Sequence, residues 1–352
     1  MVHWRDEARL AELIAAWPRD DPRFELVVVD NSASAGGVLA ATVQEGAGPD
    51  PMPASTLAER TDPDPPPPAI RLLQPGCNLG FAGGVNAGVA ASRAALLLLL
   101  NPDAVPAPGA LDRLVEGFAA HPEAAGLAPR LVGAAGEPQF AWQLRRLPSL
   151  WGCLRQTLPW PGAGTGAGPA SEPPPGTPVE QPAAAALALR RKVLLDAGGL
   201  DERFHPAWFE DVDLACRLRQ AGATLLYWPA AQFRHALGST VPGLGYGRFL
   251  WIYHRNLERY LAKHHGTAWA LLARASLAAG LAIRFPLLAV RRPRRAASRR
   301  EAAAGLLVAM TGALTGWRLP RRLADDARGA GPGAAAAAAA IGDPSAGVEH
   351  AR

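Results

Sequence analysis

NLGFAGGVNAGVAASRAALLLLLNPD, residues 78–103, contains in order a loop, a helix and a strand. Glycines crowd its beginning and alanines follow, which predicts a tight turn that leads into a helix over Gly80–Arg93. Ala95–Leu100 is a continuous apolar run, typical of a buried strand, and it stops at Asn101-Pro102-Asp103. Strands that alternate with helices indicate an α/β fold with a mostly parallel central sheet, in which ligands bind at the carboxyl ends of the strands.

The residues on the N-terminal side continue this alternation. Asp6–Trp17 has apolar residues at helical spacing, and Leu26–Val29 is a β-branched run that ends in a polar loop beginning with Asp30. Ile70–Leu73 resumes the sheet. We therefore expect Asp30 and Asp103 to lie at the same edge of one sheet.

The residues on the C-terminal side of this stretch predict further helices and strands, and after them a helical, basic region. Ala110–Ala120 and Val212–Ala221 are expected to be helices, and Ala125–Leu131 and Thr224–Trp228 to be strands. We expect a catalytic domain over residues 1–245, with flexible Gly/Pro-rich insertions at 44–69 and 159–182. A helical, basic and amphipathic region follows over residues 246–325, and an Ala-rich low-complexity tail over 326–352.

Composition excludes several classes of protein. The 352 residues are 49% hydrophobic and 19% charged, which excludes a wholly disordered chain. The three cysteines form no CxxC pair, which argues against a disulfide framework and a structural zinc site and favours the cytoplasm. Charged residues interrupt the N-terminus before any apolar signal-peptide segment begins, so export is not expected.

Three acids lie within four residues at the start of a predicted helix: Glu210, Asp211 and Asp213. The helix dipole stabilises anions there, but helix capping accounts for one acid rather than three. The aromatic residues Trp208 and Phe209 come directly before Glu210 and would remove water from it. That would raise the pKa of its carboxyl toward the range useful for a general base.

Two further groups of residues could bind a phosphate and a metal ion. The loop around Gly80 and Gly83 allows close approach of the backbone to a ligand, although a tight helix-packing turn explains the glycines too. Asn101 and Asp103 supply oxygen ligands suited to a divalent cation under a diphosphate, or alternatively Asp103 caps the next helix. His235, just beyond a strand, could complete the metal site or simply be a packed core residue.

Taken in order, these motifs resemble the family 2 glycosyltransferases, specifically their rhamnosyltransferase-like branch. The match covers roughly residues 1 to 265. It rests on VVVDNSAS (27–34), NLGFAGGVNAG (78–88), LLLLNPDA (97–104), GGLDERFHPAWFEDVDLACRLRQAG (198–222) and RHALGST (234–240). The resemblance implies the GT-A, Rossmann-like fold of nucleotide-diphospho-sugar transferases. In these relatives a longer first strand precedes the counterpart of His3-Trp4, so either that strand is short here or further residues belong upstream.

The resemblance also implies roles for individual residues. Asp211 would be the catalytic base, with Glu210 and Asp213 as supporting acids. Asp103 and His235 would bind a divalent Mg²⁺ or Mn²⁺ ion. Arg255 and Arg259, in a basic segment that includes Asn256, would contact an acceptor or its phosphate. The donor would be bound by Asp30, Asn31, Asn78, Gly80, Gly83, Asn86 and Asn101.

The expected activity is that of an inverting, metal-dependent glycosyltransferase. It would move rhamnose, from a donor such as dTDP-rhamnose, to a hydroxyl of a cell-envelope glycan or lipid-linked acceptor. Two alternatives stay open: a galactofuranosyltransferase, and a noncatalytic sugar-nucleotide-binding protein of envelope assembly. A nucleic-acid binder is not expected, because the basic residues have no interleaved aromatic platform.

The C-terminal third predicts contact with a membrane surface. Apolar segments at Thr267–Val290 and Ala302–Trp317 flank six arginines between Arg291 and Arg300. Each arginine near anionic lipid contributes about 1 kcal/mol, and flanking helices can insert apolar faces into the headgroup boundary. We expect a cytoplasmic protein held peripherally at the inner face of the cell membrane, with a solvated loop between two soluble core helices as the alternative.

Overall fold

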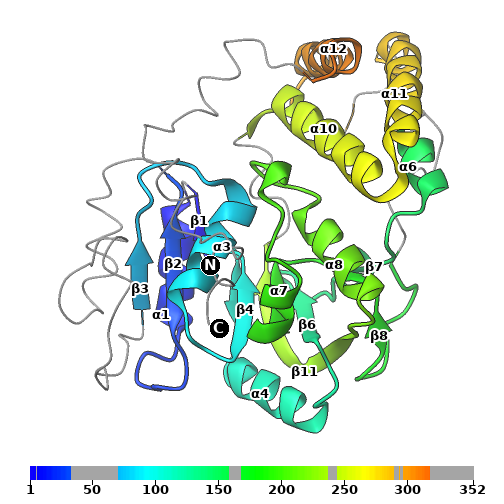
Figure 1. The fold of residues 1–352 in the computed structure, drawn as a ribbon. Coiled ribbons are helices and arrows are strands. Elements are labelled where there is room, and N and C mark those ends of the chain that lie inside the picture. Colours follow the sequence, from blue (N-terminus) through cyan, green and yellow to red (C-terminus); the bar gives the residue numbers. More distant parts are fainter. Residues whose placement is uncertain are drawn as a thin grey trace, which may run out of the picture.

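Two β-sheets flanked by helices form the body of the molecule, and three long helices lie together beside it (Figure 1). The computed structural model describes residues 1–4, 6–32, 70–157, 168–236, 244–288, 293 and 296–317. The predicted insertion at 44–69, the predicted tail at 326–352 and four of the six clustered arginines lie outside the described residues.

The first sheet is parallel and has the order β1-β2-β3. It contains β1 (Val2–His3), β2 (Leu26–Asp30) and β3 (Ile70–Leu73), and β2 pairs with both neighbours in parallel. Helix α1 (Glu7–Ala16) buries Leu10, Leu13 and Ile14, which the helical spacing places on one face. Every residue of β2 is buried, as expected for a strand covered on both faces.

The second sheet is mixed, which corrects the expectation of one mostly parallel central sheet. Its order is β4-β10-β6-β11-β5, with β8 also on β11. β10 runs antiparallel to β4 and β6, and β11 runs antiparallel to β5 and β8, so only β6 and β11 pair in parallel. The bounds are β4 (Leu96–Leu100), β5 (Ala104–Pro106), β6 (Gly126–Val132), β8 (Pro178–Val179), β10 (Ala186–Arg190) and β11 (Leu225–His235).

The antiparallel direction of β10 follows from the way the chain enters this strand. Residues 183–185 lead straight from the short strand β9 (Gln181–Pro182) into β10, and Asn101 at the end of β4 donates its backbone N–H to Ala185. The chain therefore enters β10 from the edge where β4 ends, and an antiparallel neighbour needs no crossover helix. Asp30 and Asp103 consequently follow strands of two different sheets, and not of one as expected.

Six α-helices, one 3-10 helix and a short strand, among the described residues, surround the sheets. They are α3 (Gly80–Ala91), α4 (Ala110–Ala120), α5 (Phe140–Gln143), β7 (Leu144–Arg145), α6 (Leu150–Thr157), α7 (Arg191–Asp196), the 3-10 helix η2 (Glu202–Phe204) and α8 (Glu210–Gln220). The apolar core continues from the first sheet into the second, where Val28 and Ile70 belong to the same cluster as Leu100 and Leu127. The predicted helices at 80–93, 110–120 and 212–221 are confirmed to within about two residues at each end.

The C-terminal helices α10 (Tyr246–His265), α11 (Thr267–Leu287) and α12 (Arg299–Thr315) pack on one another around their own apolar core. In Figure 1 they lie together, with α6 against α11. Helix α10 also packs on the catalytic side of the molecule, because Leu257, Tyr260 and Leu261 share a buried cluster with Phe209 and Val212. The domain boundaries given above stay a prediction.

Candidate functional site

The glycine-rich loop that begins at Asn78 contacts both the first sheet and the segment before α8. The Asn31 amide nitrogen donates to the Gly80 carbonyl at 2.8 Å, and the Asn78 side chain accepts from the Gly80 N–H at 2.9 Å. Gly80 has a φ of +73°, and a Cβ there would come within 2.9 Å of the Pro206 carbonyl oxygen. The glycine is therefore required by conformation and by space, which is the packing role that the sequence left open.

Asn86 joins α3 to the loop at residues 200–202. Its amide nitrogen donates to the Leu200 carbonyl and to Glu202 Oε1, both at 2.9 Å, while its oxygen accepts the Leu200 N–H. Gly83 is close to the same loop, since a Cβ on it would lie 3.6 Å from Glu202. The amide of Asn86 is thus engaged by the protein itself, and its contact with a donor stays a prediction.

Asp30 is buried at the end of β2 and is paired with a histidine. His3 Nδ1 lies 3.2 Å from Asp30 Oδ1, and the same oxygen accepts the Ser32 N–H at 2.9 Å. The Asp6 N–H donates to His3 Nε2 at 3.1 Å, so His3 keeps its proton on Nδ1 and donates it to Asp30. The His3 imidazole fixes the orientation of the carboxylate predicted to contact the nucleoside base.

Asp103 and His235 come together across the pairing of β5 with β11. His235 Nε2 lies 3.6 Å from Asp103 Oδ1, and both residues are buried. On the other side of the ring, His235 Nδ1 lies 2.8 Å from Gln139 Oε1, and Gln139 Nε2 donates to the His235 carbonyl at 2.9 Å. Gln139 therefore holds the proton on Nδ1 and leaves the Nε2 lone pair directed toward Asp103, while Trp142 stacks on the ring at 5.2 Å.

This pair fits a divalent cation as two of its ligands. Within the described residues, no group of three or more His, Cys, Asp or Glu side chains forms a metal cluster. One carboxylate and one imidazole, with the imidazole supported by a second hydrogen bond, match a cation that takes its other ligands from substrate phosphates and water. Asn101 lies two residues before Asp103, at the end of β4.

The three acids at the start of α8 have three different environments. Asp213 is fully buried between Arg217 Nε (2.8 Å), His264 Nε2 (2.8 Å) and Lys263 Nζ (2.7 Å). Burial opposes ionisation, but these three cations hold the pKa of Asp213 below its ordinary value. Asp213 is therefore a permanently ionised anchor between α8 and α10, rather than a proton acceptor.

Glu210 and Asp211 differ in burial. Burial, together with the charge of Asp211, raises the pKa of the Glu210 carboxyl well above its ordinary value, as the aromatic neighbours predicted. Its Oε2 has no hydrogen-bond partner among the described residues. Asp211 is only half-buried, and its Oδ2 lies 3.5 Å from Gln181 Nε2 while Oδ1 accepts the Val212 N–H. The more accessible acid of the pair is thus Asp211.

The backbone directly before these acids is strained. Trp208 and Phe209 have φ values of 72° and 78°, a region that non-glycine residues seldom occupy. Asn256 of α10 holds this segment, because its amide nitrogen lies 2.7 Å, 2.8 Å and 3.1 Å from the carbonyl oxygens of Phe204, Ala207 and Trp208. Strain of this kind persists only where the surroundings fix the backbone, and it is concentrated at functional sites.

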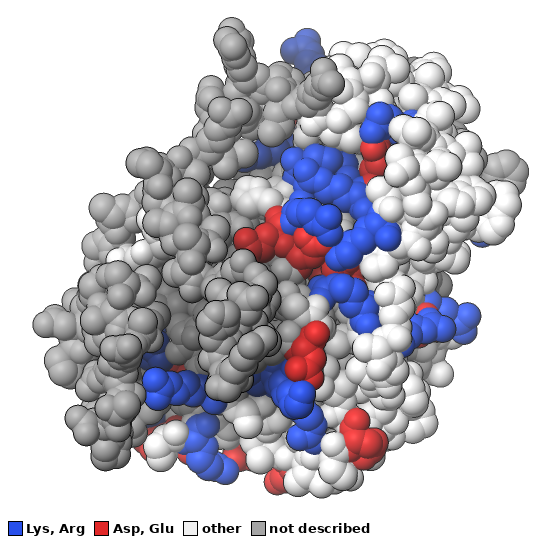
Figure 2. All heavy atoms as spheres, viewed as in Figure 1, with Lys and Arg blue, Asp and Glu red and all other residues white. Residues whose placement is uncertain are grey.

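Arginines from α10 gather around the same segment. Arg255 donates to the His205 carbonyl and Arg259 to the Arg203 carbonyl, and both also contact Asn256 Oδ1. Burial lowers the pKa of Arg255 to about 10, and burial with the nearby charge of Arg203 lowers that of Arg259. Figure 2 shows basic side chains collected beside acidic ones below the C-terminal helices. The predicted acceptor residues are thus one partly buried and one exposed cation, both bonded to the 203–205 segment that precedes α8.

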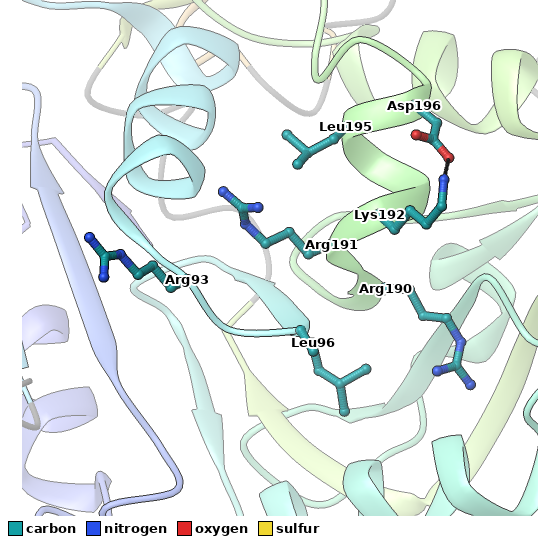
Figure 3. A pocket seen from close by; sticks show the side chains of 8 residues that line it. Arg93, Leu96, Arg190, Arg191, Lys192, Leu195 and Asp196 are labelled. Atoms are coloured by element: carbon teal, nitrogen blue, oxygen red, sulfur yellow. Dashed lines mark hydrogen bonds and ion pairs between the residues drawn. The ribbon is translucent and has the colours of Figure 1, made fainter. Parts of the chain in front are cut away.

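A pocket of about 520 Å³ lies elsewhere, at the start of β4 rather than at its end (Figure 3). Arg93, Leu96 and Arg191 line it, and none of the predicted site residues does. We place the functional site at the opposite end of β4 because the titratable groups, the strained segment and the Asp103–His235 pair are there.

Comparison with known proteins identifies the family. The family model for "Glycosyl transferase family 2" matches residues 54–170. The chain is 30% identical over 247 residues to the N-acetylglucosaminyl-diphospho-decaprenol L-rhamnosyltransferase of Mycobacterium tuberculosis, covering 65% of this chain and 79% of that protein. The chain belongs to glycosyl transferase family 2.

This family 2 glycosyltransferase is also similar to two further proteins. It is 34% identical over 157 residues to the pre-mycofactocin glycosyltransferase of Mycobacterium tuberculosis, covering 44% of this chain and 30% of that protein. A solved mannosyltransferase from Pyrobaculum calidifontis, in complex with GDP-Man and Mn²⁺, aligns with a TM-score of 0.48 and 17% identity, over 89% of this chain and 85% of that one. The assignment to the family rests on the sequence comparisons alone.

Sequence reasoning missed several residues that this glycosyltransferase uses to position its site. Gln139 and Gln181 support His235 and Asp211, and both are buried glutamines in segments without a motif. His205 lies inside a quoted motif, and its ring lies 3.1 Å from the Asn78 carbonyl oxygen. The position of His205 inside that motif is a local signal, but the two glutamines act through long-range contacts that no local pattern shows.

Proposed function

We propose that this family 2 glycosyltransferase is an inverting L-rhamnosyltransferase with the GT-A fold. The donor is a nucleoside-diphosphate rhamnose, and the acceptor is a hydroxyl on a lipid-linked diphospho-sugar of the cell envelope. The observation that carries the proposal is the 30% identity, across most of the relative's length, to a protein named for that transfer. The residue contacts around α8 and α10 support it.

Donor binding is assigned to the loops at the ends of β2 and β4. Asp30, oriented by His3, meets the base, and the loop at 78–80 lies next to it through Asn31. Asp103 and His235 would hold a divalent Mg²⁺ or Mn²⁺ ion, which when bound neutralises the charge that develops on the leaving diphosphate. Gln139 keeps the His235 imidazole in the ligating tautomer.

Asp211 is assigned the proton transfer. Its carboxylate takes the proton of the acceptor hydroxyl while that oxygen forms a bond to the anomeric carbon. The bond from the anomeric carbon to the diphosphate oxygen breaks on the opposite face, so the configuration at that carbon inverts. Asp211 suits the role better than its neighbours do, because Glu210 is buried with a raised pKa and Asp213 is occupied by three cations.

The acceptor phosphates are assigned to Arg255 and Arg259. Arg255 is partly buried and Arg259 is exposed, and both guanidiniums donate to backbone carbonyls of the 203–205 segment rather than to carboxylates. The carbonyls that now accept these hydrogen bonds are neutral. A diphosphate of the acceptor would carry negative charge and would form charge-assisted hydrogen bonds with the two guanidiniums. This places the acceptor lipid on the side of the C-terminal helices.

Those helices have an exposed apolar surface that suits a lipid-linked acceptor. Helix α11 is long and apolar enough to cross a membrane, as core helices of soluble proteins also are, and 28% of its apolar window is buried. Trp269, Leu272, Ile283 and Leu287 are exposed and spaced to share one face of α11. We propose that this face lies on the inner surface of the cell membrane, with Arg299 and Arg300 near anionic headgroups.

The decisive experiment for the activity is a donor panel. The purified protein is incubated with nucleotide sugars, a lipid-linked diphospho-N-acetylglucosamine acceptor and Mg²⁺ or Mn²⁺, and products are identified by mass spectrometry. Transfer of rhamnose supports the proposal. Transfer of galactofuranose alone replaces it with the first alternative, and donor-dependent thermal stabilisation without any product replaces it with the noncatalytic one.

Membrane association is tested separately with vesicles. We expect the full-length protein to sediment with anionic vesicles at low salt and to be released as salt increases. Replacing Leu272 and Ile283 by serine should weaken sedimentation, while replacing the buried-face residue Ala270 by serine serves as a matched control for folding. A full-length protein that stays in the supernatant at low salt contradicts the membrane proposal.

A further inference from the structure

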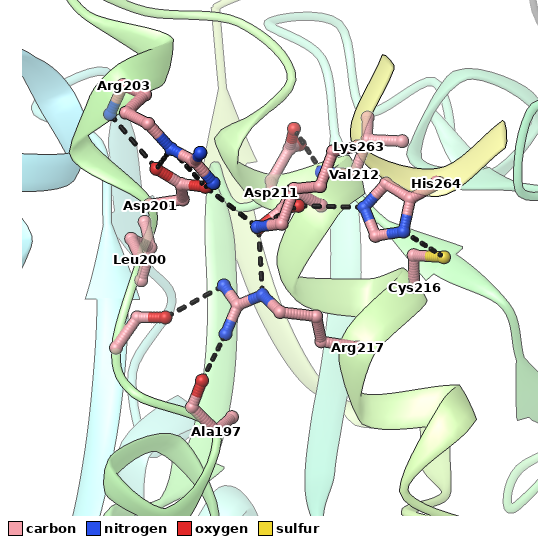
Figure 4. A network of polar contacts seen from close by, with 12 residues as sticks. Ala197, Leu200, Asp201, Arg203, Asp211, Val212, Cys216, Arg217, Lys263 and His264 are labelled. Carbon is pink, nitrogen blue, oxygen red and sulfur yellow. Dashed lines mark hydrogen bonds and ion pairs between the residues drawn. The ribbon is translucent and has the colours of Figure 1, made fainter. Parts of the chain in front are cut away.

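A cysteine, a histidine and an aspartate form a hydrogen-bonded chain where α8 meets the end of α10; Figure 4 labels the cysteine and the histidine. Cys216 Sγ lies 3.5 Å from His264 Nδ1, and His264 Nε2 lies 2.8 Å from Asp213 Oδ1. This is the order of groups that activates cysteine nucleophiles, in which the imidazole takes or shares the thiol proton and the carboxylate orients the imidazole. The proposed transfer reaction uses neither Cys216 nor His264.

We propose that Cys216 is a reactive thiolate and the modification site of this protein for low-molecular-weight disulfides. In the reaction the Cys216 sulfur attacks one sulfur of the disulfide, a new S–S bond forms, and the other sulfur leaves as a thiolate. No further oxidant is needed, because the disulfide itself is the oxidant. The proposal is independent of the sugar and the acceptor assigned above.

Catalysis of acyl transfer is a less suitable role for the same three residues. Cys216 lies inside helix α8, so the backbone N–H groups around it are already bonded along the helix. An oxyanion hole needs backbone N–H groups that are free to face a substrate. Thiol–disulfide exchange has no such requirement, since the leaving thiolate is stable by itself.

The charges around the thiol favour its ionised form. Burial opposes ionisation, but the hydrogen bond and positive charge of His264 lower the pKa of Cys216 below its ordinary value. The hydrogen bond to Asp213, with that to Cys216, raises the pKa of His264 to about 9, so the imidazole is a cation at neutral pH. The other titratable or charged groups that face this cluster are Arg217 of α8, Tyr260, Lys263 and His265 of α10, and Cys153 of α6.

Accessibility separates Cys216 from the other two cysteines. Cys216 is partly exposed, whereas Cys77 and Cys153 are buried. Burial raises the pKa of the Cys153 thiol to about 12, which keeps it protonated and unreactive. The chain therefore contains two internal controls for the reactivity of Cys216.

The test measures exchange at each cysteine of the native full-length protein. 2-Hydroxyethyl disulfide is the probe, because it is uncharged and the arginines of α10 do not attract it, and mass spectrometry maps the mixed disulfides. We expect Cys216 to react at least about ten times faster than Cys77 and Cys153. An ordinary thiol with a pKa near 8.5 slows by roughly 75-fold between pH 9 and pH 6.5, whereas Cys216 should slow by less than about tenfold.

His264→Gln removes the imidazole, and His265→Gln, at the adjacent exposed histidine, is the matched control. His264→Gln should slow exchange at Cys216 at pH 6.5 by about tenfold, with His265→Gln unchanged. Equal rates in the two variants, or equal rates at all three cysteines of the unmodified protein, would overturn the proposal. If His264→Gln does not fold, the pH profile of the unmodified protein decides, and an ordinary thiol profile overturns the proposal equally.

Discussion

Replacing Asn256 tests whether α10 holds the strained segment before the catalytic acids. In the Asn256→Ala variant the carbonyl oxygens of Phe204, Ala207 and Trp208 lose their common donor inside a buried contact. Each hydrogen bond contributes about 0.5–1.5 kcal/mol, so the variant should lose about 2–4 kcal/mol of unfolding free energy. Turnover should fall as well, because the segment leads directly into Glu210 and Asp211.

The assay is urea unfolding followed by circular dichroism, with a shared slope for the variants. Asn256→Asp is the informative control, because it keeps the oxygen that accepts from Arg255 and Arg259 and replaces the N–H donors by a second oxygen that faces the three carbonyls. We expect Asn256→Asp to be at least as unstable as Asn256→Ala. An alanine variant within about 0.5 kcal/mol of the unmodified protein, or an aspartate variant of normal stability, would refute the assignment of Asn256 as the anchor of this segment.

Three further outcomes are expected. Asp211→Asn should reduce transfer by roughly two orders of magnitude or more with donor affinity unchanged, measured by steady-state kinetics and calorimetry, and near-normal turnover would move the base to Glu210. Asp103→Ala should weaken donor binding only when Mg²⁺ or Mn²⁺ is present, and equal affinity of the unmodified protein with and without a chelator would exclude the metal site. Because burial raises the pKa of Glu210 above the ordinary 4.5, the folded protein binds this proton more tightly than the unfolded chain and loses stability as pH rises past that value. Glu210→Gln should therefore raise the melting temperature at pH 7.5, with a gain that shrinks toward pH 4.5, and a gain that is the same at both pH values would contradict the buried-acid argument.

The sequence predicts local structure better than it predicts strand direction. Periodicity and composition locate the helices and most strands, because each depends on neighbouring residues. Strand β10 was not predicted, since Ala186–Arg190 consists of strong helix formers, and only burial between β4 and β6 makes this segment a strand. Its antiparallel direction depends on the same long-range pairing.

The sequence likewise predicts some features of the candidate site and not others. Asp103 and His235 are 132 positions apart in the sequence, and the residues alone left open whether His235 joins Asp103 or is a packed core residue; the structure brings the two side chains to 3.6 Å. The aromatic neighbours in the sequence predicted the raised pKa of Glu210. The environment of Asp213 could not be predicted, because Lys263 and His264 reach it from another helix.

The segment at 200–209 is held from two sides, by Asn86 of α3 and by Asn256 of α10. The C-terminal helices are therefore not a module that can be exchanged freely between relatives to redirect the enzyme to another acceptor. A chimera joined near residue 245 would import a foreign α10, and with it a foreign set of donors for the Phe204, Ala207 and Trp208 carbonyls. Engineering of acceptor choice in this chain has to transplant the 200–209 segment and α10 as one unit.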